Sequence, residues 1–295
     1  MDFVLSILAP TMLSLMMAGL GFSLSPRDFQ QALSRKRALT IGLLVHTLGL
    51  PLIAVALIAL LSPSTSVAFG IIILACCSGG TTANVFTHLS GGDTALSIAL
   101  SLAGKVLTVI TIPLFVGIAA SWLLSQHATV AISILDVGKQ ILILVVAPVA
   151  VGMAARALAP NASRSLQGVV NKISMALLVL FTILVIYNTR EHLAELAGSA
   201  GIISVLLCSL AMGAGYAVAR LSGLSMPERK AILFHTAVQN ASFAAVLAVT
   251  TFKSEEMAVP AIVYTVVMNG AGLLLVNLIK RRDARSAQSE VKARA

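Results

Sequence analysis

The chain has 295 residues, of which 58% are hydrophobic and only 11% are charged, and its mean hydropathy is +0.98. A soluble domain of this composition would expose large apolar surfaces to water, so the composition favours an all-α membrane protein. The net charge of +9 would also suit a nucleic-acid-binding protein, but the basic residues flank apolar segments and form no single basic surface. We therefore expect a lipid bilayer as a partner and no nucleic acid.

Nine apolar segments are long enough to cross the hydrocarbon layer of a bilayer as helices. They lie near residues 4–24, 38–62, 66–91, 94–123, 131–156, 168–189, 197–220, 227–250 and 257–279. The polar stretches between them are too short to fold separately, which predicts a single domain of nine transmembrane helices over residues 1–295. Only Asp2 and no basic residue precedes the first segment, so we expect it to remain a membrane helix; a cleaved secretory signal is the alternative.

The basic residues predict the orientation of these helices. With the N-terminus outside, sixteen of the twenty Lys and Arg residues fall in cytoplasmic loops or in a basic cytoplasmic tail, residues 280–295. Only Lys139, Arg190 and Lys253 fall on the other side, and Lys105 lies inside a segment. This asymmetry predicts an outside N-terminus and a cytoplasmic C-terminus. The absence of a transit peptide favours a bacterial inner membrane.

Residue types that carry catalysis are sparse in the apolar segments. All eleven acidic residues lie in loops, in tails or near segment ends, and the three cysteines, Cys76, Cys77 and Cys208, have no metal-site spacing. The sequence contains none of the common zinc-protease, nucleotide-binding or serine-hydrolase motifs. We therefore expect no enzymatic activity, no cofactor and no disulfide framework.

Two of the apolar segments are interrupted by polar residues, one in each half of the chain. The third is broken at 76–84, Cys-Cys-Ser-Gly-Gly-Thr-Thr-Ala-Asn, and the eighth at 237–242, Ala-Val-Gln-Asn-Ala-Ser. In lipid, backbone that leaves helical geometry must line protein or water, so such breaks mark the place where a transporter holds its cargo. With four segments in the first half and five in the second, the breaks have opposite orientations. This arrangement predicts inverted repeats with two broken crossing helices.

The residues around these breaks carry a resemblance to a known family. They are Gly-Leu-Gly-Phe-Ser-Leu at 19–24 with Asp28, the stretch at 76–87, Gly-Asp-Thr-Ala-Leu-Ser at 92–97, and Gln-Asn at 239–240. Between residues 19 and 279 the chain resembles the bile acid:sodium symporter family. The resemblance implies a secondary transporter of an organic anion, of carboxylate or sulfonate type, that works by alternating access. It also implies panel helices near 4–24, 131–156 and 168–189, and core helices near 38–123 and 197–279.

Members of that family that use sodium bind it at two sites, and this chain departs from both. At the first site the resemblance implies the positions of Ala83, Asn84, Ser97, Ser101 and His235, and His235 stands where those members have a Glu. At the second it implies His46, where they have a Gln, together with His235, the side chain of Gln239 and carbonyl groups near residues 236 and 238. Sodium prefers hard oxygen ligands. We therefore expect both sodium sites to be weakened and assign no metal site.

Lys105 adds a positive charge at membrane depth. It shares one helical face with Ser97 and Ser101, and roughly eleven residues of helix, about 16 Å, separate it from the nearer end. A sodium ion about 5 Å from this charge would be repelled by about 3 kcal/mol at an effective dielectric of about 20. We expect Lys105 to replace sodium beside Asn84, with coupling by a proton or no coupling. His235 and His46 would assist a proton, or serve only in packing. Alternatively, Lys105 is a fixed charge that holds the broken helices together.

The resemblance implies three residues that contact the substrate, Thr81, Asn240 and Asn269. A positive residue and two histidines at depth, without a carboxylate, favour an anionic substrate. A family His is Met268 in this chain, which argues against a bile-acid-like substrate, and Asn269 would alternatively join two helices by a hydrogen bond. Two other functions remain open: a sodium-dependent symporter despite these replacements, and a membrane sensor or channel of the same fold.

Overall fold

The computed structural model describes residues 7–23, 36–124, 139 and 142–294. Within these ranges every named element is a helix, which confirms the predicted all-α class. The one β interaction among them is an isolated antiparallel bridge between Gly79 and Gln239. Residues 4–6, the first loop with Arg27, Asp28 and Arg35, and most of residues 131–141 lie outside the described residues, although the sequence predictions cover them.

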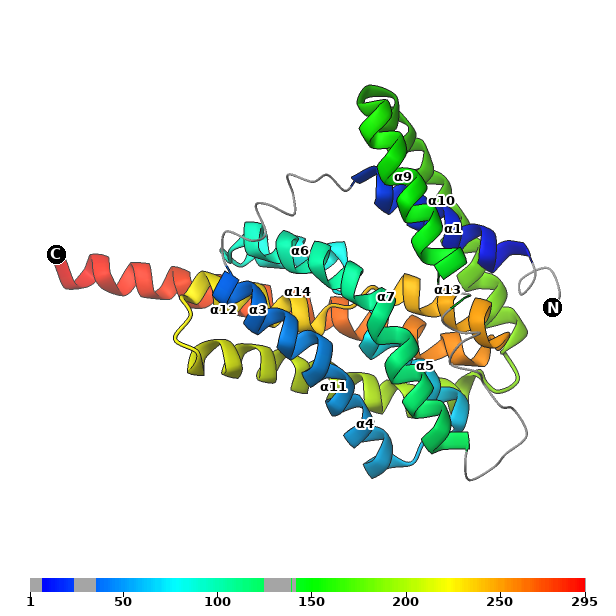
Figure 1. Ribbon diagram of the computed structural model, residues 1–295. Helices are drawn as coiled ribbons and strands as arrows, with labels where there is room; N and C mark the ends of the chain where they lie inside the picture. The colour runs from blue at the N-terminus through cyan, green and yellow to red at the C-terminus, as the bar shows by residue number, and fades with distance from the viewer. Residues whose placement is uncertain (1–6, 24–35, 125–138, 140–141, 295) are drawn as a thin grey trace.

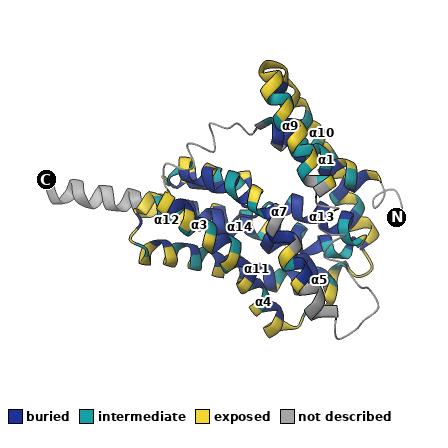
Figure 2. Ribbon diagram, viewed as in Figure 1, coloured by how far each residue is buried: buried dark blue, intermediate teal, exposed yellow. Residues whose placement is uncertain are grey.

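Four helical stretches are long and apolar enough to cross a membrane: Lys36–Leu61, Pro160–Asn188, Leu193–Leu221 and Glu256–Arg282. Their outer surfaces carry exposed apolar side chains, such as Leu60, Ile183 and Val266. Figure 2 shows the exposed residues on the outside of the helices and the buried ones between them. Lipid tails would cover such a surface, so the exposed surface of these helices suits the interior of a bilayer.

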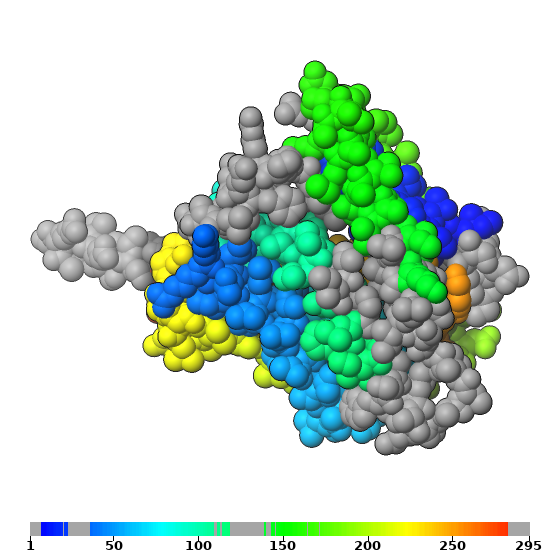
Figure 3. All heavy atoms as spheres, viewed as in Figure 1, coloured from blue at the N-terminus to red at the C-terminus, as the bar shows by residue number. Residues whose placement is uncertain are grey.

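The helices form two groups that the view in Figure 1 separates clearly. The smaller group contains α1 (Ala9–Ser23), η4 (Leu142–Val146), α9 (Ala147–Leu158) and α10 (Pro160–Asn188). The larger group contains α3 (Lys36–Leu44), η3 (Val45–Gly49), α4 (Leu50–Leu61), α5 (Thr65–Cys76), α6 (Thr81–Leu89), α7 (Thr94–Leu124), α11 (Leu193–Leu221), α12 (Met226–Ala237), α13 (Ala241–Phe252), η5 (Glu256–Ala258) and α14 (Val259–Arg294). The two groups meet where α1 packs against α13. Figure 3 shows the atoms of α9 and α10 projecting beyond the larger group.

Local sequence signals explain several helix ends. Helix α4 ends at Ser62, which has a left-handed conformation with φ of 44°, and Pro63 follows it. Helix α12 begins with a capping box in which the Ser225 amide donates to Glu228 Oε2 at 2.8 Å. At the other end of the chain, α14 continues to Arg294, so the segment predicted as a basic tail extends the last helix.

Two glycines allow α1 and α9 to pack closely within the smaller group. A Cβ atom on Gly152 would collide with the carbonyl oxygen of Ala18 and lie 2.9 Å from the Cα of Gly21. A Cβ on Gly21 would in turn collide with the carbonyl oxygen of Val149. Helices in lipid gain most of their association energy from such close packing, because the solvent is itself apolar.

We expect Gly152→Ala to destabilise the protein in mild detergent by about 1–3 kcal/mol, because the added methyl group must push α1 and α9 apart. Gly168→Ala is the matched control, since Gly168 lies in α10 and a Cβ atom added there would have nothing within 4 Å. Thermal unfolding of the two purified variants measures the difference. Equal melting temperatures would contradict close packing of α1 on α9.

Candidate functional site

The two predicted breaks lie side by side and bind each other. Helix α5 ends at Cys76 and α6 begins at Thr81, and Cys77 and Gly80 between them have an extended backbone. Helix α12 ends at Ala237 and α13 begins at Ala241, and Val238 between them is extended. The amide of Gly80 donates to the carbonyl of Val238, and the amide of Asn240 donates to the carbonyl of Ser78, both at 2.9 Å. The breaks therefore satisfy part of each other's backbone hydrogen bonding, as backbone within a bilayer requires.

Small residues are needed where the breaks meet. A Cβ atom on Gly79 would lie 2.5 Å from Nδ1 of His235, and one on Gly80 would lie 2.9 Å from the carbonyl oxygen of Gln239. A larger residue at the first position must displace the ring of His235 in α12, and one at the second must displace the backbone of Gln239. The two glycines of the first break are thus required by the close approach of the second.

A side chain that the sequence analysis missed supports the second break. Tyr264 of α14 is fully buried and donates from its hydroxyl to the carbonyl of Ala237, the last residue of α12, at 2.7 Å. The carbonyls at a helix end lack partners within the helix. A lone tyrosine in an apolar segment was the available signal, because a buried hydroxyl needs a hydrogen-bond partner.

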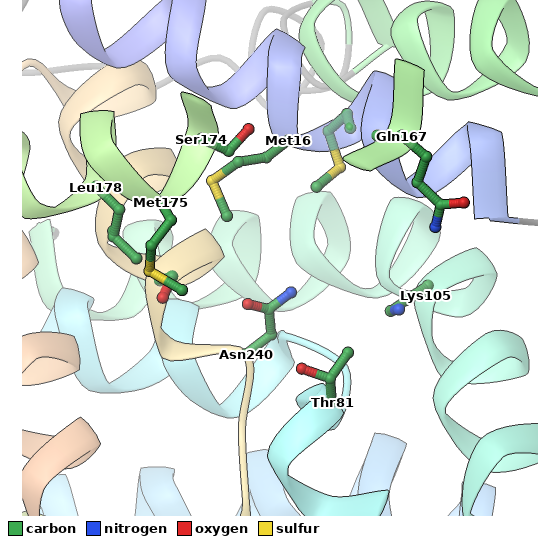
Figure 4. Close-up of a pocket in the computed structure, with 11 residues that line it drawn as sticks. Met16, Thr81, Lys105, Gln167, Ser174, Met175, Leu178 and Asn240 are labelled. Carbon is green, nitrogen blue, oxygen red and sulfur yellow. The ribbon is translucent and has the colours of Figure 1, made fainter. Parts of the chain in front are cut away.

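A cavity of about 470 Å³ lies between the breaks and the smaller helix group (Figure 4). Thr81, Lys105, Asn240 and Ser242 line it from the larger group. Side chains of α1 and α10 form the opposite wall: Met16, Met17, Gln167, Ser174, Met175 and Leu178. The sequence did not indicate which side chains of these two helices face the cavity, because most of them are apolar, and apolar residues face lipid and cavity alike.

Two helices begin at the cavity. Thr81 is the first residue of α6, and Asn240 caps α13 by accepting a hydrogen bond from the amide of Phe243 at 3.3 Å. Helix N-termini carry a partial positive charge and free amide groups, so they favour anions. Among the described residues that line the cavity, Lys105 is the only one with a full charge. The cavity is therefore electropositive.

Three of the predicted ion-site residues form a hydrogen-bonded cluster next to the cavity. The hydroxyls of Ser97 and Ser101 donate to Oδ1 of Asn84 at 2.7 and 3.2 Å. Thr87, which the sequence analysis missed, donates to Oγ of Ser97 at 3.3 Å. Thr87 lies three residues after Asn84 on the same face of α6, and from this spacing the sequence could have predicted that Thr87 joins the cluster. Lys105 is one turn beyond Ser101, and its side chain lines the cavity.

The other predicted ion-site residues lie beneath the breaks. The rings of His46 and His235 are 4.8 Å apart, and Nε2 of His46 lies 2.9 Å from the carbonyl of Cys77, which can only accept. Gln239 donates to the carbonyl of Thr236 at 2.6 Å. Within the described part of the chain, both ring nitrogens of His235, Nδ1 of His46 and Oε1 of Gln239 have no partner. Burying such atoms unpaired costs about 1–3 kcal/mol each.

Asn269 is the one predicted substrate residue that lies apart from the described lining of the cavity. Its amide donates to the carbonyl of Thr265, one turn earlier in α14, at 2.7 Å. Thr81 and Asn240, the other two, lie next to each other at the cavity in Figure 4.

The sequence matches the model of the sodium bile acid symporter family over residues 10–196. The uncharacterized sodium-dependent transporter YocS of Bacillus subtilis is 30% identical over 288 residues, which are 95% of this chain and 86% of YocS. The chain belongs to the sodium bile acid symporter family. Membership agrees with the expectation of a transporter and not an enzyme, since the family consists of integral membrane transporters.

Two further relatives are eukaryotic. The chain is 26% identical to the "probable sodium/metabolite cotransporter BASS2, chloroplastic" of Oryza sativa over 92% of its own length and 63% of the rice protein. It is 24% identical to the human ileal sodium/bile acid cotransporter over 87% of its length and 73% of the human protein. The chain thus spans less than two thirds of the rice relative. The sodium bile acid symporter family also includes relatives with different named substrates.

We expect a cysteine at Thr81 to react with a maleimide in the detergent-solubilised protein at least about tenfold faster than a cysteine at Ala83. Both residues are in α6, but Thr81 is exposed to the cavity, whereas Ala83 is fully buried. The native cysteines, Cys76, Cys77 and Cys208, are buried and should add little background. Mass spectrometry of the labelled protein gives both rates. Similar rates would contradict an open cavity at the first break.

Proposed function

We propose that this chain is a secondary carrier of an organic anion, of carboxylate or sulfonate type, that works by alternating access. The observation that carries the proposal is the electropositive cavity at the paired breaks, walled on its other side by a separate group of helices. The smaller group acts as a panel, and the larger group acts as a core that moves against it. This motion exposes the cavity to the two sides in turn.

The proposed transmembrane arrangement has nine helices in inverted repeats. Several crossing segments consist of two shorter helices, such as α5 with α6 and α12 with α13, which are individually too short to span a bilayer. The N-terminus is placed outside and the C-terminus in the cytoplasm, on the basis of the distribution of Lys and Arg. The relative from Bacillus subtilis favours a bacterial plasma membrane.

The substrate's charge follows from the cavity. Thr81, Asn240 and the start of α13 offer hydrogen-bond donors, and Lys105 offers the positive charge. No acidic side chain is found among the described residues that line the cavity. Asn269 is proposed as a further substrate contact, which it would make after turning away from its own helix.

Coupling is proposed to differ from that of sodium-dependent members. Oδ1 of Asn84 already accepts two hydroxyl hydrogen bonds, and His235 and His46 replace oxygen ligands. With Gln239, these residues provide few free oxygens and no negative charge, so they suit sodium poorly. Lys105 takes the place of one sodium ion as a resident positive charge, and a proton is the remaining candidate for a coupling ion.

A sodium-dependent symporter is the second candidate function. It is favoured by the names of the relatives, which include a sodium-dependent transporter 30% identical to this chain. The carbonyl groups of the two breaks would then have to supply most of the ligands.

We expect uptake of at least one anion from a labelled panel of octanoate, phenylacetate, octanesulfonate and cholate into proteoliposomes. Uptake should saturate, show counterflow and ignore an imposed sodium gradient. In Lys105→Thr, sodium affinity should rise by up to about 100-fold, because the repulsion of about 3 kcal/mol is removed. Uptake by both proteins is measured with sodium and pH gradients imposed separately, and the sodium concentration that gives half of the maximal effect on uptake reports the sodium affinity.

Each of the other possible results of these proteoliposome assays would indicate a different function or a different coupling ion. Uptake driven by sodium in the unmodified protein would establish the second candidate. Uptake driven by a proton gradient in the unmodified protein, and residual uptake in Lys105→Thr that no longer responds to that gradient, would identify Lys105 as the coupling group. Binding of an anion without counterflow would contradict a carrier and indicate a sensor.

A further inference from the structure

We infer that Lys105 binds the acid group of the substrate directly and selects anions over neutral molecules of the same shape. This inference rests on the proposed function and adds a substrate contact to it. The ammonium group donates to an oxygen of the carboxylate or sulfonate. Thr81 and Asn240 donate to the same group from the two breaks.

The carbonyl oxygen of Asn84 is already used by two neighbouring hydroxyls. A carbonyl oxygen has two lone pairs, and Ser97 and Ser101 already donate to both on Oδ1 of Asn84. Ser97 and Ser101 are fully or almost fully buried, at 0% and 3% exposure. Oδ1 of Asn84 is therefore fully used within the cluster, and the acceptors that remain there are uncharged hydroxyl oxygens.

The side chain of Lys105 lines the cavity. Figure 4 shows it on the same cavity as Thr81 and Asn240, which come from two other helices. Among the described residues, none accepts a hydrogen bond from its ammonium group. A positive charge at membrane depth needs a counter-charge, and an anion in the cavity would supply one.

The opposite wall indicates how the substrate is oriented. Four of its side chains, Met16, Met17, Met175 and Leu178, present apolar and adaptable surface, and its two polar side chains, Gln167 and Ser174, are uncharged. The acid group therefore faces Lys105, and the apolar part of the substrate faces α1 and α10. Charge is recognised by the larger helix group and shape by the smaller one.

A cycle of two ligands and two proteins tests the role of Lys105. The ligands are the anion of the panel that binds best and its primary amide, or its sulfonamide where the anion is a sulfonate. Binding to the unmodified protein and to Lys105→Gln is measured by calorimetry in sodium-free buffer. We expect the unmodified protein to prefer the acid by about 10- to 100-fold, as for a charge-assisted hydrogen bond. In Lys105→Gln this preference should fall to near one, while the affinity for the amide changes little.

Two control variants separate a direct contact from other effects. Lys105→Arg keeps the charge and should keep a preference for the acid, which also shows that the position tolerates substitution. Lys172→Gln removes one exposed charge from α10 outside the cavity and should leave the preference unchanged.

The outcomes distinguish this inference from the proposed function. If no anion of the panel binds to the unmodified protein, the proposed function fails. If anions bind but Lys105→Gln keeps the full preference for the acid, or weakens acid and amide alike, the proposed function stands and the inference is overturned.

Discussion

The structure depends on one constraint, that backbone polar groups within a bilayer must find partners in the protein. Two segments leave helical geometry at membrane depth, and each supplies hydrogen bonds for the other through Gly80 with Val238 and Asn240 with Ser78. This pairing fixes where the breaks cross. It also requires glycine at the crossing, draws the Tyr264 hydroxyl to the end of α12, and brings the start of two helices to one cavity.

The same crossing determines which charges the protein can hold at its centre. Helix N-termini at the crossing favour an anion. In this chain the positive charge at the cavity belongs to a side chain of the protein, Lys105. The oxygen groups near it, Asn84 with Ser97 and Ser101, are occupied with one another. In the proposed carrier, this fixed charge balances the anion without a bound metal ion.

Much of this arrangement was predictable from the sequence, because the bilayer imposes simple rules. Apolar length located the helices, and polar residues inside apolar segments located both breaks. Helical spacing brought Ser97 and Ser101 onto one face, and the structure joins them through Asn84. The direction of the Lys105 side chain, which lines the cavity, was not predictable, since a long flexible side chain has several rotamers and its tertiary surroundings select one. The wall formed by Met16 and Met175 was hidden for another reason, because apolar residues face lipid and cavity alike.

A resident ammonium group differs from a bound sodium ion in the step that returns the empty carrier. Sodium dissociates with the substrate, so an empty sodium-dependent core moves without that charge. Lys105 cannot leave. In the proposed carrier the loaded core pairs Lys105 with an anion, whereas the empty core must move an unpaired charge through a region of low dielectric, which is costly. Exchange of one anion for another is therefore faster than net flow, unless a proton leaves Lys105 before the return.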